Sequence, residues 1–353
     1  MLTKELEYDL PAERIAQFPI ERRDESRLLV YHRDSGETQH CFFHELPDVL
    51  PPETSVFRND VSVLKARLIG QRPSGGIVEC LLLHPENPSS TTWSCLLKPG
   101  AKTEKAGGFS LPGEYQATVL DKNSSGEYLI RFDLEKDEDV KILANRIGSM
   151  PLPPYIKREA NTFDEERYQT VYSDPASRTG VAAPTAGLHF TPELLNELTR
   201  CGHPIHDLTL SVGIGTFRPI EAERIEDHPM GAETYRLPPS TKAALRKPGS
   251  GRLAVGTTTV RSIEDYLAQG EDSRPEEVTV SDTRLFIRPP RDFQGVDLLL
   301  TNFHLPRSTL LCLVAAFLSP GEEGGLPLLK ELYAEALSLD YRFYSYGDAM
   351  LVL

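Results

Sequence analysis

The sequence predicts an α/β domain, layered as helix, sheet and helix, that is interrupted by a small all-β barrel. Short β runs between glycine and proline turn signals fill residues 62–135. From about residue 137, strand-like runs alternate with capped amphipathic helices, and the segment Tyr8–Leu64 has the same mixed character. We therefore expect 1–61 and 136–353 to form one discontinuous domain around a barrel inserted at 62–135.

The predicted barrel has apolar runs but no convincing helical period. Turn signals such as Gly75-Gly76, Pro99-Gly100 and Ser125-Gly126 separate these runs. The expected strands are Lys65–Ile69, Gly76–His84, Thr92–Lys98, Tyr115–Leu120 and Glu127–Leu134.

Helix start signals mark the α/β part. Thr191 followed by Pro192 predicts a capped helix, and Ser308 predicts a second cap. Arg252–Val255 reads as a strand that runs through Gly256 into a helix, and Asp297–Thr301 reads as another strand. Pro327 is expected to start a further helix.

Composition restricts the partners and the compartment. The 353 residues carry 38 Lys plus Arg against 52 Asp plus Glu, a formal charge of -14, which disfavours a nonspecific nucleic-acid coat. An RNA partner would have to meet a local basic patch. The longest apolar run, Leu310–Leu318, is far shorter than the ~20 residues that cross a bilayer, and residues 1–10 hold no secretory signal. We expect a cytoplasmic protein without membrane association.

Cysteine usage argues against a metal site. The five cysteines are widely spaced, with no CxxC pair and no adjacent histidine cluster. We expect reduced thiols, and neither a metal nor a resident cofactor. Oligomeric state is left open between a monomer and a weak homodimer.

Five stretches are richer in Gly, Thr, His and aromatic residues than a packed core requires: 168–172, 182–190, 211–217, 255–261 and 301–306. The last four lie at or just beyond predicted strand ends, the edge where α/β sheets bind ligands. Gly256, Thr257 and Thr258 can present N–H groups at a helix N-terminus with Arg261 one turn along, although a plain capped turn has the same pattern. Gly213 and Gly215 do not fit a dinucleotide motif because Pro219 follows.

Titratable and basic residues supply further candidates. His189, His228 and His304 can exchange protons near neutral pH, and Glu233 and Asp348 can act as bases or orienting carboxylates; a structural role is the competing interpretation for each. Lysine and arginine side chains can contact phosphates, and Tyr155 can stack on a base. The candidate phosphate contacts are Arg22, Arg23, Arg27, Lys65, Arg67, Lys157 and Arg158.

Long, rare strings in a fixed order carry a resemblance to a known family. They are SRLLV (26–30), Asn59-Asp60, ARL (66–68), MPLPPYI (150–156), YQTVY (168–172), AAPTAGLHF (182–190), VGIGTF (212–217), VGTTTVRSIE (255–264), TNFHLPRSTLL (301–311) and YRFYSYGDAML (341–351). Over almost its whole length the chain resembles the S-adenosylmethionine:tRNA ribosyltransferase-isomerase family of queuosine biosynthesis.

The resemblance implies a transfer in which S-adenosylmethionine (AdoMet) is a co-substrate that donates its ribosyl group. The acceptor is 7-aminomethyl-7-deazaguanine at the wobble position of tRNAs with a GUN anticodon, those for aspartate, asparagine, histidine and tyrosine. The product is epoxyqueuosine, and adenine and methionine leave. The implied fold is likewise an α/β domain interrupted by a β-barrel.

Such chemistry needs proton exchange at C5′ and at adenine, and donors for developing oxyanions. The catalytic candidates are His189, His304, Glu233, Asp348 and Thr185. The substrate-binding candidates are Tyr168, Gln169, Thr170, Pro184, Phe190, Gly213, Gly215, Thr216, Phe217, His228, Gly256, Thr257, Thr258, Arg261, Asn302 and Tyr346. The RNA-binding candidates are Lys65, Arg67, Tyr155, Lys157 and Arg158.

The chain departs from the family pattern at three places. Ser211 and Gly231 stand where the family usually has histidines, and Pro290 stands where it has glycine. Two alternatives therefore accompany the main hypothesis: a divergent paralogue that uses AdoMet on another nucleoside, and a noncatalytic RNA-binding module.

Overall fold

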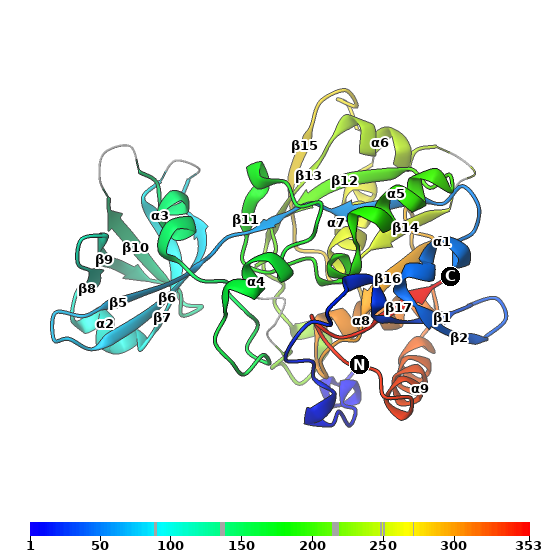
Figure 1. Cartoon of the computed structure of the whole chain (residues 1–353), viewed down its shortest axis with the longest axis horizontal. Helices are drawn as coiled ribbons and strands as arrows, with labels where there is room; N and C mark the ends of the chain where they lie inside the picture. The colour runs from blue at the N-terminus through cyan, green and yellow to red at the C-terminus, as the bar shows by residue number, and fades with distance from the viewer. Residues whose placement is uncertain (88–89, 135–137, 214–218, 248, 250, 271) are drawn as a thin grey trace.

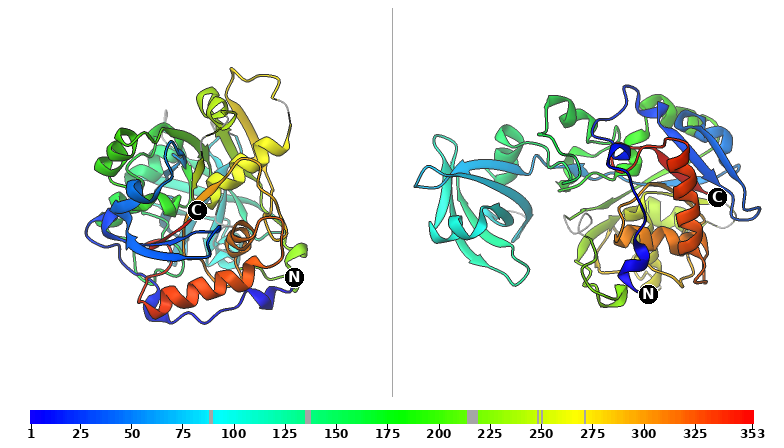
Figure 2. Two further views of the ribbon diagram at one scale, coloured as in Figure 1. Left: turned by 90° about the vertical axis from the view of Figure 1, so that its right-hand side faces the viewer. Right: turned by 90° about the horizontal axis from the view of Figure 1, so that it is seen from below.

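The structure is a computed structural model that describes residues 1–353 except 88–89, 135–137, 214–218, 248, 250 and 271. It consists of a mixed nine-stranded sheet with helices on both faces and a closed six-stranded barrel. Figure 1 shows the barrel at one end of an elongated molecule, with both chain termini in the larger part. The right-hand view of Figure 2 shows the barrel projecting from that part. The fold class predicted from the sequence is confirmed.

The barrel strands form in the order β10-β7-β6-β5-β8-β9, and every neighbouring pair is antiparallel. They are β5 (Arg67–Gln71), β6 (Ile77–Pro85), β7 (Thr92–Lys98), β8 (Gly108–Leu111), β9 (Tyr115–Lys122) and β10 (Tyr128–Asp133). The sequence prediction omitted β8, because its four residues lie between glycine-containing turns that read as one loop. Helix α2 (Gly100–Lys105) connects β7 to β8.

Helix α3 (Val140–Ile147) packs against the barrel. Its Val140, Leu143 and Ala144 belong to the same apolar cluster as the barrel interior. The domain boundaries at 62 and 135 stay a prediction, and this packing suggests that the barrel unit continues through α3.

The large sheet has the order β15-β13-β12-β3-β14-β16-β17-β1-β2. Its strands are β1 (Arg27–Tyr31), β2 (Thr38–Phe42), β3 (Ser55–Asn59), β12 (Ile205–Leu210), β13 (Glu233–Leu237), β14 (Arg252–Val255), β15 (Thr279–Thr283), β16 (Leu298–Asn302) and β17 (Ala349–Val352). The first strand of the chain pairs in parallel with the last, since Leu28 lies opposite Ala349. The two ends of the chain thus build one sheet around the inserted barrel. A separate two-stranded sheet pairs β4 (Ser62–Val63) with β11 (Arg178–Gly180).

Helices cover both faces of this sheet because its strands are apolar on both sides. In β1, Leu28 and Val30 pack into one apolar cluster and Leu29 and Tyr31 into another. The first cluster includes residues of α1 (Leu46–Val49) and α5 (Pro192–Arg200); the second includes residues of α7 (Thr257–Ala268), α8 (Thr309–Leu318) and α9 (Gly325–Ser338). The remaining helices are α4 (Thr162–Arg167) and α6 (Pro239–Leu245).

The predicted helix starts are confirmed where capping chemistry marked them. The Thr191 side chain accepts a hydrogen bond from the Leu194 N–H at α5, and Ser308 accepts one from Leu311 at α8. Helix α9 begins two residues before the predicted Pro327. No helix of the described residues combines the length and the apolar character that crossing a membrane requires.

Candidate active site at the strand ends of the sheet

Four parallel strands end at one edge of the sheet. β12, β3, β14 and β16 run in the same direction and are adjacent. β17 runs antiparallel to β16, so the loop that precedes β17 reaches the same edge. Open α/β sheets bind their ligands at the carboxyl ends of the strands. This edge is therefore the expected place for a site.

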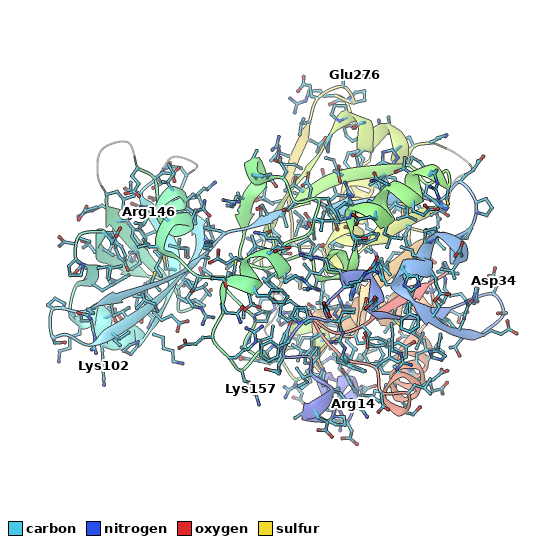
Figure 3. The ribbon with its side chains drawn as sticks, in the orientation of Figure 1. Arg14, Asp34, Lys102, Arg146, Lys157 and Glu276 are labelled. Atoms are coloured by element: carbon cyan, nitrogen blue, oxygen red, sulfur yellow. The ribbon has the colours of Figure 1, made fainter. Side chains whose placement is uncertain are left out.

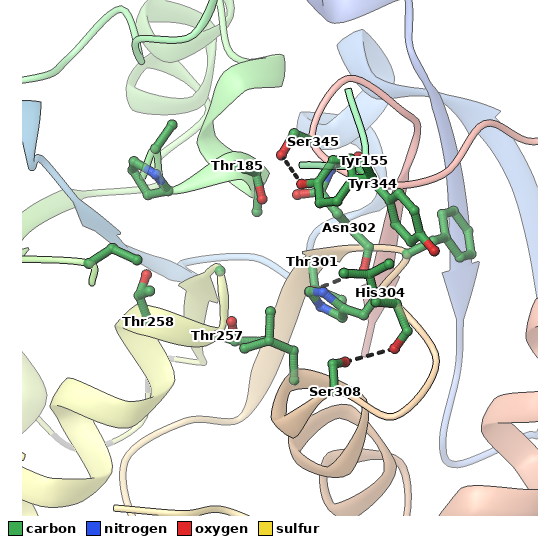
Figure 4. Close-up of a pocket in the computed structure, with 18 residues that line it drawn as sticks. Tyr155, Thr185, Thr257, Thr258, Thr301, Asn302, His304, Ser308, Tyr344 and Ser345 are labelled. Atoms are coloured by element: carbon green, nitrogen blue, oxygen red, sulfur yellow. Dashed lines mark hydrogen bonds between the residues drawn. The ribbon is translucent and has the colours of Figure 1, made fainter. Parts of the chain in front are cut away.

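A pocket lies at this edge and is called the strand-end pocket. Its empty volume is about 620 Å³, part of which is open to solvent. It is lined by residues 183–186, 256–258 and 301–305 together with Tyr155, Val212, Ser308, Leu310, Tyr344 and Ser345. In Figure 4, Thr185, Thr257 and Thr258 lie across the pocket from Tyr155 and His304. Four of the sequence stretches singled out above thus meet in one place.

The N-terminus of α7 forms one wall. Gly256 precedes the helix with φ 87°, a left-handed conformation that favours glycine. The Thr259 and Val260 N–H groups donate to the Gly256 carbonyl, whereas among the described residues the Thr257 and Thr258 N–H groups have no acceptor. Two donors at the positive end of a helix dipole therefore remain for a ligand.

Asn302 forms the opposite wall and connects it to a buried histidine. Its Nδ2 contacts His189 Nε2 at 3.1 Å, and His189 Nδ1 contacts Ser26 Oγ at 2.6 Å. Because Ser26 donates its hydroxyl proton to the Arg23 carbonyl, His189 donates from Nδ1 and accepts at Nε2. Asn302 is buried, and its Oδ1 has no hydrogen-bond partner among the described residues. The pocket wall thus holds an unsatisfied acceptor beside an oriented imidazole.

His304 is the second buried histidine at this edge of the sheet. Its Nε2 lies 2.7 Å from Thr301 Oγ1, and its backbone N–H donates to the Tyr333 hydroxyl at 2.9 Å. Burial lowers the pKa of His304 to about 3. Burial, followed by the positive charges of Arg342 and Arg23, lowers the pKa of His189 to about 3 as well. Both imidazoles are therefore neutral at pH 7, and serve as hydrogen-bonding groups rather than cations.

A second, smaller pocket adjoins the first and is called the arginine pocket. Its empty volume is about 260 Å³. It is lined by Pro19, Ile20, Arg23, Ser26, Arg167, Leu188, His189, Arg342 and residues 345–347. Ser345 lines both pockets. Of the predicted site residues, His189, Tyr346 and the candidate phosphate contact Arg23 lie here. The Tyr346 hydroxyl donates to Asp164 Oδ1 at 2.7 Å.

Glu233 and Asp348 lie outside both pockets and are already engaged. Glu233 forms a close ion pair with Arg261 and accepts the Gly213 N–H at 3.0 Å. Asp348 is buried and accepts the backbone N–H groups of Arg27 and Arg342 at 3.0 and 2.7 Å. These contacts favour structural roles for both carboxylates. The same ion pair engages Arg261 Nη1, whereas the buried Nη2 of Arg261 has no partner among the described residues.

The YQTVY stretch packs against residues next to the strand-end pocket without lining it. Gln169 bonds both the N–H and the carbonyl of Val63, at 2.9 and 2.7 Å. A Cβ on Gly187 would lie 2.8 Å from a Thr170 methyl carbon, so this glycine permits close packing behind Thr185. Tyr168 and Phe190 are fully buried among other aromatic rings. None of these candidates lines the strand-end pocket.

The glycine-rich stretch and its neighbours contribute less to the described site. Gly215, Thr216 and Phe217 lie outside the described residues, and Gly213 does not line either pocket. His228 is half-buried against Phe286, and burial lowers its pKa. Ser211 bonds Thr179 through the two hydroxyls at 2.7 Å.

The predicted RNA contacts divide into paired and unpaired groups. Lys65 pairs with Glu165 at 2.7 Å, Arg67 with Glu79 at 3.5 Å, and Arg158 with Asp164 at 2.6 Å. Lys157 is exposed and forms no ion pair within the described part of the chain; Figure 3 shows it at the lower rim, on the side of the larger part that faces the barrel. Tyr155 lines the strand-end pocket, and its ring packs on Tyr344 at 4.6 Å.

Sequence reasoning missed several lining residues. Thr301, Ser308, Tyr344 and Ser345 line the pocket but were not among the candidates. Tyr344 has φ 71°, a strained backbone for a bulky residue that is common at functional sites. The signal available in the sequence was the YRFYSYGDAML string, from which only Tyr346 and Asp348 were selected.

Within the described ranges, no three His, Cys, Asp or Glu side chains are close enough together to hold a metal ion. The absence of a resident metal or cofactor stays a prediction.

Comparisons with known proteins agree with this architecture. Residues 3–352 match the family described as queuosine biosynthesis protein. Proteins named S-adenosylmethionine:tRNA ribosyltransferase-isomerase from Thermotoga maritima and Geobacter metallireducens are each 43% identical to the chain, with 100% of both sequences covered. A crystal structure of S-adenosylmethionine tRNA ribosyltransferase from Thermotoga maritima matches with TM-score 0.55 and 35% identity, covering 99% of this chain and 100% of that one. The chain therefore belongs to the queuosine biosynthesis protein family.

Proposed function

We propose that the chain is an S-adenosylmethionine:tRNA ribosyltransferase-isomerase. It transfers and isomerises the ribosyl group of AdoMet onto 7-aminomethyl-7-deazaguanine at the wobble position of GUN-anticodon tRNAs. The observation that carries the proposal is end-to-end similarity, at 43% identity, to proteins with this name. The sequence stretches behind the original resemblance also supply most of the lining of the strand-end pocket.

The polar groups of the strand-end pocket suit the adenosine part of AdoMet. Adenine offers an amino donor and ring-nitrogen acceptors. Within the described ranges, Asn302 Oδ1 is an unpaired acceptor, and the Thr257 and Thr258 N–H groups are unpaired donors. Tyr155 and Tyr344 supply aromatic surface at the same pocket. Binding would satisfy these buried polar groups. Leaving such a group unpaired costs about 1–3 kcal/mol.

The neutral imidazole of His304 suits a proton-transfer step, whereas both nitrogens of His189 are already hydrogen-bonded and would have to exchange a partner first. The reaction removes a proton from C5′, expels adenine, and releases methionine as the epoxide closes. His304 lines the pocket, whereas His189 reaches it through Asn302. A neutral imidazole can accept a proton at one nitrogen while the other is held by a hydrogen bond. Hydroxyls of Thr185 and Thr257 can donate to oxygen atoms that gain charge.

AdoMet is a co-substrate in this proposal, and no resident cofactor takes part. The proposal also includes the GUN set of tRNAs, a cytoplasmic location, and a monomer or weak homodimer as the oligomeric state. The names of the relatives support the ribosyltransferase activity over the paralogue and over the noncatalytic RNA-binding module.

The test is an incubation of the purified protein with AdoMet and tRNA that carries 7-aminomethyl-7-deazaguanine at the wobble position. Nuclease digestion and mass spectrometry should reveal epoxyqueuosine, with adenine and methionine released in equal amounts. A tRNA with guanine at that position is the matched control and should be unchanged. Binding of AdoMet without any product would favour the paralogue, and absence of AdoMet binding would favour the RNA-binding module.

A further inference from the structure

The arginine pocket has an unusual charge balance. Three guanidinium groups, those of Arg23, Arg167 and Arg342, line it, and none of the described residues lining it is an aspartate or glutamate. The chain as a whole carries a formal charge of -14. A small, positively charged recess in an acidic protein points to an anionic ligand.

Two of the arginines are held by backbone carbonyls instead of carboxylates. Arg23 donates to the carbonyls of Gln169, Leu188 and Glu166 at 2.9, 3.1 and 2.8 Å. Arg167 donates to the Glu21 and Ile20 carbonyls at 2.9 and 2.7 Å. Neither forms an ion pair within the described part of the chain. Carbonyl partners fix the position of a guanidinium without cancelling its charge.

The electrostatic cost of this arrangement is visible in the pKa values of Arg23 and His189. Burial, followed by the charge of Arg167, lowers the pKa of Arg23 to about 10, so Arg23 remains charged at pH 7. The charges of Arg342 and Arg23 also help to keep His189 neutral. An anion in the pocket would relieve the repulsion among these groups.

Arg342 has the most hydrogen-bonding capacity left. Among the described residues, its side chain makes only long contacts of 3.5 Å: a hydrogen bond to the Phe18 carbonyl and an ion pair with the buried Asp348 Oδ1. The backbone N–H of Arg342, not its guanidinium, makes the short bond to Asp348. The guanidinium of Arg342 can therefore turn toward an oxyanion without losing a strong bond.

The neighbouring site indicates which anion fits. Ser345 lines both pockets, and the Asn302–His189 contact joins their walls. The amino-acid end of AdoMet carries an ammonium group beside its carboxylate, and an all-arginine lining would repel that ammonium. A phosphodiester is a simple anion, and in a nucleotide it lies within one residue of the base.

We infer that the arginine pocket binds a phosphodiester next to the target nucleotide of the tRNA, while the base reaches the strand-end pocket past Ser345. This inference rests on the proposed function and adds a phosphate subsite to it. Arg342 supplies the ligand contact, and Arg23 and Arg167 supply fixed positive charge.

The test compares anticodon stem-loops that carry a neutral methylphosphonate at single positions around the wobble nucleotide. For the wild-type protein, one position should weaken binding roughly tenfold, as expected for loss of a charge-assisted hydrogen bond. Arg342→Gln should weaken binding of the native stem-loop to a similar degree, and the same methylphosphonate should then cost nothing further. In Arg342→Gln, the slope of log affinity against log salt concentration should become shallower by about 0.7, which corresponds to the loss of one phosphate contact.

Controls separate this inference from its competitors. Arg342→Lys keeps the charge and should retain most of the salt slope. This result would show that the loss in Arg342→Gln comes from the missing charge and not from misfolding. Arg274→Gln removes one exposed arginine far from the pocket and should change nothing. Additive effects of Arg342→Gln and every methylphosphonate would overturn the inference. Weaker AdoMet binding with unchanged stem-loop binding would also overturn it and assign the pocket to the AdoMet carboxylate. Failure of the proposed function would instead show as absence of epoxyqueuosine with the wild-type protein.

Discussion

The barrel and the strand-end edge of the large sheet differ in how their buried polar residues are paired, although the buried Nε atoms of Arg67 and Arg72 in the barrel also have no partner among the described residues. Between Arg67 and Asp133, Ser94 and Thr103 are the buried polar side chains of the described residues, and both have protein acceptors, Glu127 Oε2 and the Pro99 carbonyl. At the strand ends, the buried Asn302 Oδ1 and two N–H groups of α7 lack partners in the part of the chain that the structure describes. Buried polar groups are normally satisfied within the protein. The barrel is therefore built for stability, and the sheet edge is built for a ligand.

Creating a cavity in the barrel interior gives the largest expected effect on the free energy of unfolding. Phe132 is 1% exposed in the barrel interior, so Phe132→Ala should lower the free energy of unfolding by about 3–5 kcal/mol. Urea denaturation measures this loss. Ile77→Ala, at a side chain 66% exposed on the same barrel, is the matched control and should have little effect. A large change in AdoMet affinity of the folded Phe132 variant would contradict the separation of roles.

Removing the unpaired acceptor comes second. Asn302→Ala deletes the free Oδ1 and the contact to His189, and kcat/KM for AdoMet should fall about 100-fold, roughly 2.7 kcal/mol. Steady-state kinetics with substrate tRNA measure the loss. The assay temperature stays below the melting temperature of the variant protein. Ser94→Ala makes a comparable polar deletion in the barrel and should leave kcat/KM unchanged. Equal losses of kcat/KM in Asn302→Ala and Ser94→Ala would contradict the difference between the sheet edge and the barrel.

Acid should destabilise the sheet edge through its two buried histidines. The pKa of each is near 6.5 in the unfolded chain and about 3 in the folded protein. The unfolded state thus binds more protons between these values, and stability is lost as pH falls from about 6.5 toward 3. At pH 5 each histidine should cost about 2 kcal/mol. Denaturation curves of the wild type, His304→Gln and the exposed-barrel control His84→Gln at pH 7.5 and 5 test this. An equally steep acid loss in His304→Gln would contradict it.

The family departures should give the smallest effects. A Cβ on Gly231 meets open space, so Gly231→His should change the free energy of unfolding by less than about 0.5 kcal/mol. Ser211→His breaks the bond to Thr179 and should cost about 1 kcal/mol. Thermal melting measures both. Under the proposed function the double variant keeps or improves epoxyqueuosine formation, whereas a marked loss of activity on the true substrate would support the paralogue.

Local signals predicted much of the fold. Capping side chains at Thr191 and Ser308 act within one helical turn, so their effect is readable from adjacent residues. Strand β8 was missed because four residues between glycines carry too little pattern. The position of Thr257, Asn302 and His304 at or just beyond strand ends was also readable, because parallel strands bring their carboxyl ends to one edge.

Which charged groups are available could not be predicted in this way. Glu233 is neutralised by Arg261, 28 positions away, and Asp348 is bound to the backbone of Arg27 from the other end of the chain. Composition treats each as one carboxylate among 52 acidic residues. The availability of a charge depends on its spatial neighbours, which no local pattern records.

By itself, the sequence determined the α/β fold class with its inserted barrel and the strand-end stretches, because periodicity, turns and caps are local. Only the tertiary structure decided that Tyr155 lines a pocket, that Glu233 is paired and that three arginines from distant segments share one recess. The physical reason is that burial and Coulomb interactions depend on distance in space, and folding joins Arg23, Arg167 and Arg342 across more than 300 positions of the chain.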